Sequence, residues 1–311
     1  MAHTVILPYT RGMVNSPVYS PKSFPTSFSK NCWIVLGFVV AVILWGAVVR
    51  ATGSGAGCGA HWPLCNGEMI PGLARYQTLI EWIHRATSGL SLVAVLGLGW
   101  KAFQVFPPGA IQRRYAVAAM VGIVMEALIG AALVLLRLVE HDQSLDRAIS
   151  IALHLTNTCF LVGALALLAE GAAWPKPSAR RRQGGWVLAG FVVLAAAGAW
   201  TALGDTLFAV SSFQEGWVRD WARDAHFLER LRILHPILAV SWVAGVVPWL
   251  LSIPKLQGRQ APQIAIGLIL FNLVLGGANV IFAAPLALQI LHLAVANALW
   301  VSLVLSWVRG A

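Results

Sequence analysis

Charged residues are scarce in this chain. Only 11% of its 311 residues are Asp, Glu, Lys or Arg, whereas soluble proteins carry roughly 25%. This composition excludes an ordinary soluble domain. Hydrophobic residues instead make up 58% of the chain, and the mean hydropathy is +0.74. The composition predicts an integral membrane protein whose main surroundings are the lipid bilayer.

Acidic residues are scarcer still, with 12 against 22 basic residues and a formal net charge of +10. In a soluble protein this excess would suggest nucleic-acid binding. Here the basic residues form short clusters between apolar segments. That pattern is typical of the orientation signal of membrane proteins, and we expect no nucleic-acid partner.

Cysteine is also rare, and the four that occur are too few for a disulfide-rich scaffold. Cys58 and Cys65 share one loop, while Cys32 and Cys159 fall in or beside apolar segments. Residues 1–31 are rich in Pro and Ser and lack the apolar core of a signal peptide. We expect them to form a poorly ordered cytoplasmic tail.

Long apolar runs are what the chain has in abundance. A window of about 19 residues finds eight segments that are long enough to cross a hydrocarbon core of about 30 Å. They lie at residues 32–51, 80–103, 115–137, 148–169, 186–204, 229–251, 262–282 and 286–308. The predicted fold class is an all-α integral membrane protein with eight transmembrane helices.

Lys and Arg predict the orientation of these spans. More than half of the 22 basic residues lie in the tail, at the C-terminus and in three short connections with almost no acids. The opposite loops mix acidic and basic residues, at 51–79, 138–147 and 205–228. We therefore expect a cell (inner) membrane protein with both termini in the cytoplasm. A disulfide between Cys58 and Cys65 could persist on the outer side.

The two halves of the chain resemble each other. "EWIHRATSGLSLVAVLGL" aligns with "RILHPILAVSWVAGVV", which places His84 on His235. "ALHLTNTCFLVGALAL" aligns with "ILHLAVANALWVSLVL", which places His154 on His292, and "ALIGAALVLL" resembles "LVLGGANVIF". Four helices separate the copies, so both copies have the same topology. We predict two tandem, pseudo-symmetric four-helix bundles and a cytoplasmic linker, at residues 32–170, 186–311 and 171–185.

The four histidines of this repeat lie one to two turns inside the outer ends of their spans. A single histidine on an apolar helix is often a satisfied core residue, but four at one depth favour metal ligation. Paired imidazoles from facing helices suit the two axial positions of haem iron. Zinc fits less well, because a tetrahedral site needs further ligands at the same point. The pattern predicts two bis-histidine haem sites near the outer face.

The first outer loop carries a further pattern. "WGAVVRATGSGAGCGAHWPLCNGEMIP" is followed by "EWIHR". With the eight spans and the later histidines, these motifs resemble the haem A synthase family over residues 33–308. The family usually has Pro-Asp before the Trp-Pro, where this chain has Ala60 and His61. Some members carry a second cysteine pair in the outer loop of the C-terminal half, and loop 205–228 has none.

The resemblance implies an oxidoreductase that converts haem O into haem A for terminal oxidases, by successive hydroxylation of one methyl substituent to a formyl group. It implies that His84 and His154 hold the substrate haem, whereas His235 and His292 hold a haem b. Haem O and dioxygen or water are the implied substrates, with haem O synthase and an electron donor as partners. The sequence leaves open whether the protein forms a homo-oligomer. The glutamate of the Glu-x-x-His-Arg motif, Glu81, is implied to be catalytically important.

Glu81 and Arg85 distinguish the two halves, because the aligned positions hold Arg232 and Pro236. Oxidation of a methyl group needs a proton acceptor or a held water. Glu81 lies one turn from His84 on the same helix face, so it can orient water or accept a proton. The alternatives are a surface ion pair between Glu81 and Arg85 and favourable charge at a helix N-terminus.

Other polar residues near these spans have open roles. Arg50 and Arg85 could bind haem propionates or reach towards lipid headgroups. A Cys58–Cys65 disulfide could fix the loop as a lid or take part in redox or substrate handling. Glu126 lies mid-span, where an acid is a functional candidate by default. It could instead be protonated and bonded to a neighbouring helix, and the sequence assigns it no role.

Two other function classes compete with this prediction. A di-haem electron-transfer protein of cytochrome b type would also need two bis-histidine sites. Those sites would be stacked across the membrane, whereas the four histidines share one depth. A transporter would need broken, polar helices near the midplane, for which Glu126 is the only support.

Overall fold

The computed structural model describes residues 25–72, 75–174, 177–253 and 260–309. The regular elements of these residues are helices, apart from one isolated bridge between Cys65 and Glu68. Eight helices have the length and apolar composition to cross a membrane. The prediction of an all-α membrane protein with eight spanning helices is therefore confirmed. Residues 1–24 of the predicted tail lie outside the described residues.

The spanning helices follow the order of the predicted segments. Their bounds are α1 Thr26–Ala51, α2 Tyr76–Val105, α3 Ile111–Leu135, α4 Leu145–Glu170, α5 Ala179–Leu207, α8 Leu234–Leu251, α9 Ala261–Ile281 and α10 Leu286–Arg309. The short helix α7, Phe227–Leu231, continues into α8, and together they form the sixth span. Another short helix, α6, covers Phe213–Asp220.

The helices extend beyond the apolar windows where polar residues cap them. Helix α5 begins at Ala179, inside the segment 171–185 that the sequence assigned to a linker. The Ser178 hydroxyl accepts a hydrogen bond from the backbone N–H of Arg181, at 3.0 Å. This bond satisfies one of the free N–H groups at the helix start. The turn rich in arginine is therefore helical although it is polar.

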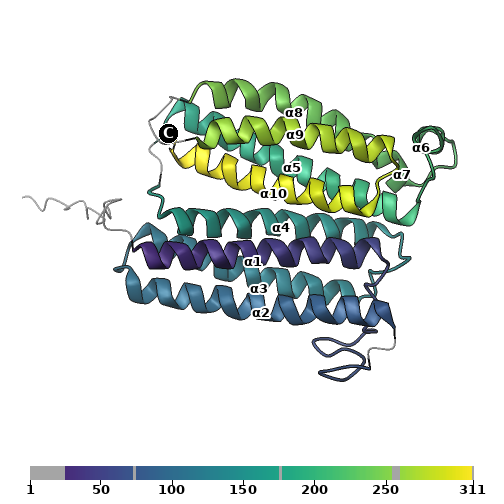
Figure 1. Ribbon diagram of the computed structural model, residues 1–311, viewed down its shortest axis with the longest axis horizontal. Helices are drawn as coiled ribbons and strands as arrows, with labels where there is room; N and C mark the ends of the chain where they lie inside the picture. Colours follow the sequence, from purple (N-terminus) through teal and green to yellow (C-terminus); the bar gives the residue numbers. More distant parts are fainter. Residues whose placement is uncertain (1–24, 73–74, 175–176, 254–259, 310–311) are drawn as a thin grey trace, which may run out of the picture.

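The helices pack as two groups of four (Figure 1). Helices α1 to α4 contact one another in a closed ring, which we call the N-terminal bundle. Helices α5, α8, α9 and α10 form a second ring, which we call the C-terminal bundle. The two bundles meet where α4 lies against α5 and α10. Their pseudo-symmetry stays a prediction.

Helix α4 is the most buried span because it lies at this junction. Its C-terminal half carries the fully buried side chains of Leu161, Leu165 and Leu168. Across the junction, the indole of Trp300 on α10 donates a hydrogen bond to the Cys159 carbonyl, at 2.7 Å. The same indole stacks on Phe191 of α5, with ring centroids 5.1 Å apart. The hydrogen bond from Trp300 to Cys159 joins the two bundles, and the stacking on Phe191 fixes the indole within the C-terminal bundle.

One end of the molecule carries the longer connections (Figure 1). The loop between α1 and α2 lies there, as do α6 and α7, while α1 begins and α10 ends at the opposite end. The loop contains a disulfide between Cys58 and Cys65, so the predicted pairing is confirmed. The positions of the connections agree with the predicted grouping of outer loops, whereas the side that faces the cytoplasm stays a prediction.

Candidate functional site

The four histidines of the repeat occupy matching places in the fold. They lie within three turns of the first residue of the second and fourth spans of each bundle: His84 in α2, His154 in α4, His235 in α8 and His292 in α10. All four spans begin at the end that carries the loops (Figure 1). The structure therefore brings the histidines together in two pairs near that end.

In the C-terminal bundle, the rings of His235 and His292 face each other. Their centroids are 6.3 Å apart and their planes cross at 83°. A bond between a metal and an imidazole nitrogen is about 2 Å long, so two rings on opposite sides of one metal ion have centres about 6 Å apart. The His235 Nδ1 lies 3.1 Å from the Leu194 carbonyl, which leaves Nε2 free to ligate. The separation fits one iron atom between two axial imidazoles.

Two glycines that the sequence analysis missed let the histidine rings approach the neighbouring helix. A Cβ on Gly198 of α5 would lie 3.0 Å from the His235 ring. A Cβ on Gly46 of α1 would lie 3.1 Å from the His84 ring. The repeat could have identified these two glycines, because each precedes the histidine of its own bundle by almost the same number of residues. Each bundle therefore has a histidine ring seated on a glycine of its first helix.

In the N-terminal bundle, His84 lies on α2 and His154 on α4, and both helices pack against α3. The Nδ1 atom of His84 is buried without a hydrogen-bond partner. The Nδ1 atom of His154 lies 2.6 Å from the Glu126 carboxylate. Glu126 thus acquires a definite partner, which the sequence had not supplied. The hint was an acid in the middle of an apolar helix, but its position relative to α4 depends on helix packing.

Neither histidine pair belongs to a larger metal cluster. Across the residues that the structure describes, no group of three or more His, Cys, Asp or Glu side chains could hold a metal ion. A tetrahedral zinc site needs such a group, whereas haem needs only axial ligands because the porphyrin supplies the rest. The spacing of the rings, the glycines beneath them and the two-ligand sets all fit haem.

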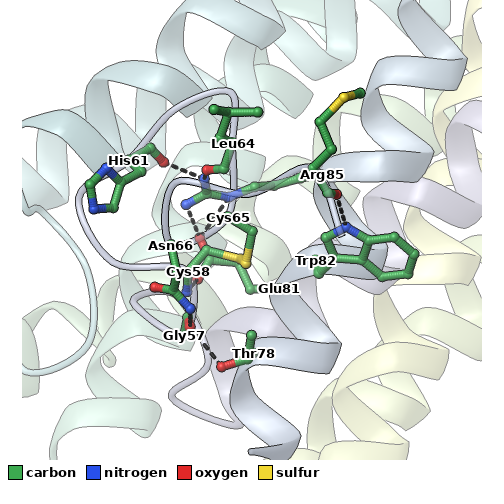
Figure 2. Close-up of a disulfide and its surroundings, with 11 residues drawn as sticks. Gly57, Cys58, His61, Leu64, Cys65, Asn66, Thr78, Glu81, Trp82 and Arg85 are labelled. Atoms are coloured by element: carbon green, nitrogen blue, oxygen red, sulfur yellow. Dashed lines mark hydrogen bonds and ion pairs between the residues drawn. A yellow bond between two sulfur atoms is a disulfide. The ribbon is translucent and has the colours of Figure 1, made fainter. Parts of the chain in front are cut away.

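Glu81 lies one turn before His84 and is almost fully buried, with 3% exposure. Its Oε2 atom accepts a hydrogen bond from the backbone N–H of Cys58, at 2.7 Å. Its Oε1 atom accepts from the guanidinium of Arg85 on the next turn, at 2.5 Å to Nη2. Figure 2 shows the carboxylate between the disulfide loop and α2. Glu81 therefore anchors the loop between α1 and α2, whether its further role is catalysis or only the ion pair with Arg85.

Arg85 completes this anchor. Its Nη1 atom donates to the Leu64 carbonyl, at 2.7 Å, and also to the His61 carbonyl. Nearby, the Thr78 hydroxyl donates to the Gly57 carbonyl, at 2.8 Å (Figure 2). The start of α2 therefore holds the loop through charged and neutral hydrogen bonds on both sides of the disulfide. Four of the five guanidinium N–H groups are engaged in this way.

Arg50 joins the bundles at the same end of the molecule. It extends from the end of α1 to the Ala202 carbonyl of α5, at 2.5 Å, and to the Thr206 hydroxyl. It also donates to the side-chain oxygen of Gln289 on α10, at 2.9 Å. The guanidinium retains its Nε–H group and one further N–H for a ligand.

The C-terminal bundle has the opposite charge where the N-terminal bundle has Glu81. Arg232, at 8% exposure, forms ion pairs with three carboxylates: Asp205 at 3.6 Å, Asp220 at 3.2 Å and Glu229 at 3.5 Å. Burial raises the pKa of Asp220, and the charge of Arg232 opposes that shift. At this position the C-terminal bundle therefore buries a cation, Arg232, among acids, whereas the N-terminal bundle buries an acid, Glu81, that is paired with Arg85.

The family model described as a cytochrome oxidase assembly protein (COX15-CtaA) matches residues 30–304. A protein of Thermus thermophilus named protoheme IX farnesyltransferase is 46% identical over 279 residues. That match covers 86% of this chain but 46% of the relative, so this chain spans about half the length of that relative.

Relatives from Bacillus match a shorter stretch. A protein of Bacillus licheniformis named heme A synthase is 45% identical over 98 residues, which is 30% of each chain. A protein of Bacillus mycoides with the same name is 41% identical over 96 residues, or 31% of each chain. The match that spans most of this chain is therefore to a relative named a farnesyltransferase, whereas the relatives named heme A synthase match about a third of the chain.

Proposed function

The chain belongs to the cytochrome oxidase assembly protein family, as its resemblance to haem A synthases predicted, and we propose that it is a haem A synthase. It oxidises a methyl substituent of haem O to a formyl group by successive hydroxylations. With dioxygen as the oxidant, each of two hydroxylations takes two electrons from the donor and two protons, adds one oxygen atom to the carbon and releases the other as water. Loss of water from the resulting gem-diol leaves the formyl group of haem A. Haem O synthase and an electron donor are its expected partners.

The observation that carries this proposal is the unequal charge beside two similar histidine pairs. Each pair offers two imidazoles from facing spans, which suits axial ligation of haem iron. Among the described residues, carboxylates lie beside the N-terminal pair alone, with Glu81 one turn from His84 and Glu126 in contact with His154. Hydroxylation of a methyl group moves protons between dioxygen-derived oxygen and water, so a carboxylate or a water held beside the ring serves this chemistry. We therefore assign haem O to the N-terminal bundle and haem b to the C-terminal bundle.

In the C-terminal bundle, His235 and His292 would hold haem b, which supplies one-electron chemistry when it is bound. The Leu194 carbonyl orients the His235 ring. Arg50 extends from α1 into this half and has free N–H groups for a propionate. Arg85 offers one free N–H group on the substrate side. Both arginines are proposed to bind propionates while they keep their contacts within the protein.

Glu81 has two proposed tasks in the N-terminal bundle. It orients water or accepts the proton that leaves as the methyl group is hydroxylated. It also fixes the disulfide loop over the site through Cys58 and, with Arg85, through the carbonyls of His61 and Leu64. Because Arg85 shares the same carboxylate, a movement of Arg85 would free one oxygen of Glu81 to accept a proton.

The name of the Thermus relative suggests prenyl transfer as a second candidate. Transfer of a farnesyl group from a diphosphate needs Mg²⁺, which carboxylates and phosphate oxygens bind. The described part of this chain contains no cluster of three acids that could hold a metal ion. The match also covers less than half of that relative, so its named activity can belong to the unmatched part. These observations favour oxidation over prenyl transfer.

Extracted haem from the full chain, co-expressed with a source of haem O, tests the proposal. Chromatography of that haem should show haem b together with haem A. Haem b alone would favour the electron-transfer protein, and farnesylated product formed from haem b and farnesyl diphosphate would favour the transferase. The absence of haem A despite available haem O would reject the proposed activity.

The orientation of the chain is also part of the proposal, with both termini in the cytoplasm and the haem sites near the outer face. Labelling with a membrane-impermeant maleimide tests it. The native thiols give little background, because Cys32 and Cys159 are buried and Cys58 is bonded to Cys65. Gln143→Cys, in the connection before α4, should react in whole spheroplasts. Reaction after disruption only would place this connection in the cytoplasm.

A further inference from the structure

We propose that Glu126 is a positioning residue for His154, which keeps Nε2 of the imidazole available as a ligand for the substrate iron and would make it a stronger electron donor. This inference rests on the proposed function, since it presumes that the N-terminal bundle binds haem O. It concerns a residue to which the sequence assigns no role. It would explain why an acid lies within the apolar helix α3.

The carboxylate of Glu126 is surrounded by groups of α4. Its Oε2 atom lies 2.6 Å from the His154 Nδ1. Its Oε1 atom accepts from the Asn157 amide at 2.8 Å and from the Thr158 hydroxyl at 2.9 Å. The Asn157 amide also donates to the Gly122 carbonyl of α3. Asn157 and Thr158 follow His154 by three and four positions, so all three residues share one face of α4.

This set of donors determines what Glu126 can do for His154. An ionised carboxylate is an acceptor only. Oε1 accepts from Asn157 and Thr158, whereas Oε2 lies beside the His154 Nδ1. The His154 Nδ1 lies 2.6 Å from the Glu126 carboxylate, within reach of a charge-assisted bond, but the ring does not point its N–H along the hydrogen-bond direction in this conformation. When Nδ1 carries the proton and donates it to Glu126, the lone pair of neutral imidazole is on Nε2. Glu126 thereby selects the tautomer that can bind iron.

The chemistry of such partners is general. A metal-bound histidine usually donates its other N–H to a carboxylate or carbonyl, which fixes the ring and raises its basicity as a ligand. A carboxylate has this effect more strongly than a neutral carbonyl, because the bond is charge-assisted. A stronger axial donor stabilises the ferric state, so it lowers the reduction potential of the iron.

The C-terminal bundle provides the internal comparison. The repeat places Asn272 on Glu126, and it places Val295 and Ala296 on Asn157 and Thr158. His292 faces the backbone of Asn272, and its Nδ1 has no partner at normal hydrogen-bond geometry. The partner of His235 is the neutral Leu194 carbonyl. In the described residues, a carboxylate beside a histidine of the repeat is therefore particular to the N-terminal bundle.

Glu126→Gln is the direct test, because it keeps the shape of the side chain and removes its charge. The single oxygen of Gln can face either the two donors of α4 or His154. In the first case its amide faces Nδ1 and favours the wrong tautomer. Glu126→Asp keeps the charge and is the conservative rescue. Asn272→Ala is the matched control in the other bundle.

The readout is haem binding and redox potential in the purified full chain, with haem b as the probe for both sites. Spectroelectrochemistry should give two waves, of which His84→Ala or His154→Ala removes the one from the N-terminal site. We expect Glu126→Gln to weaken binding at this site about 10- to 100-fold and to raise its potential. Glu126→Asp should restore part of both, and Asn272→Ala should leave this wave unchanged.

An unchanged affinity and potential of the N-terminal wave in Glu126→Gln would overturn the inference. If that variant loses haem from both sites, Asn157→Val decides, because it removes a support of Glu126 and leaves the carboxylate. A raised potential would support the role of Glu126, and an unchanged one would overturn it. If the unsubstituted chain binds no haem in the N-terminal bundle, the proposed function itself fails. The two failures are therefore distinguishable.

Discussion

The two bundles share their histidines and differ in their buried charges. Near the histidines, the N-terminal bundle buries Glu81 and places Glu126 against His154. At the aligned positions the C-terminal bundle has Arg232 and Asn272. A repeated helical scaffold can thus supply the same ligand pair twice, while acids introduced in one copy change its chemistry. In our proposal, one copy holds a redox haem and the other acts on its haem.

The largest effect on activity is expected when the buried negative charge of Glu81 is removed from the N-terminal bundle. Glu81→Gln keeps the hydrogen bond from Cys58 but removes the charge, so the rate of haem A formation should fall about 10²- to 10⁴-fold. Haem b should stay bound. Single-turnover assays of haem O conversion measure the rate. Glu68→Gln, in the same loop but exposed, is the control, and equal rates for both variants would argue against a catalytic Glu81.

The next largest effect concerns the buried cation of the C-terminal bundle. Arg232→Ala removes the ion-pair partner of Asp205 and Asp220 and leaves Glu229 with Arg219 alone. Breaking such a buried network costs about 3–5 kcal/mol. Thermal unfolding in detergent measures the loss. Arg219 pairs with Glu229 as well, but its side chain is 47% exposed, so Arg219→Ala should cost less than about 1 kcal/mol. Similar melting temperatures for the two variants would contradict the assigned network.

A smaller effect is expected from the disulfide, which only the N-terminal bundle has among the described outer loops. Replacing Cys58 and Cys65 together with Ser removes a short cross-link, which should cost about 2 kcal/mol. Because Glu81 and Arg85 also hold the loop, haem b content should not change. Limited proteolysis of the loop measures its opening. An unchanged cleavage rate would show that the polar contacts alone hold the loop closed.

The smallest effects test whether the glycines beneath the histidines act separately in the two bundles. Gly46→Ala should displace the His84 ring and reduce substrate haem only, and Gly198→Ala should displace the His235 ring and reduce haem b only. Overpacking of this kind costs about 1–3 kcal/mol. Gly37→Ala and Gly185→Ala, on the same two helices with open space around them, are the controls. Loss of both haems in either variant would contradict separate sites.

The features that could be predicted from the sequence are those encoded locally. Apolar length gave the eight spans, and the repeat gave matching positions for the histidines. Two cysteines in one short loop gave the disulfide. The contact between Glu126 and His154 could not be predicted, because it depends on the rotation of α3 against α4. The inter-bundle contacts of Arg50 and the short helices α6 and α7 were missed for the same kind of reason, since none leaves a local hydropathy signal.

The distribution of haems between the two histidine pairs tests the central claim most directly. The full chain, co-expressed with a source of haem O, is purified and its haems are extracted and separated. A variant with His84→Ala and His154→Ala should retain haem b and lose haem O and haem A. A variant with His235→Ala and His292→Ala should lose haem b and retain haem O. Loss of the same haem from both variants would contradict the division of tasks between the bundles.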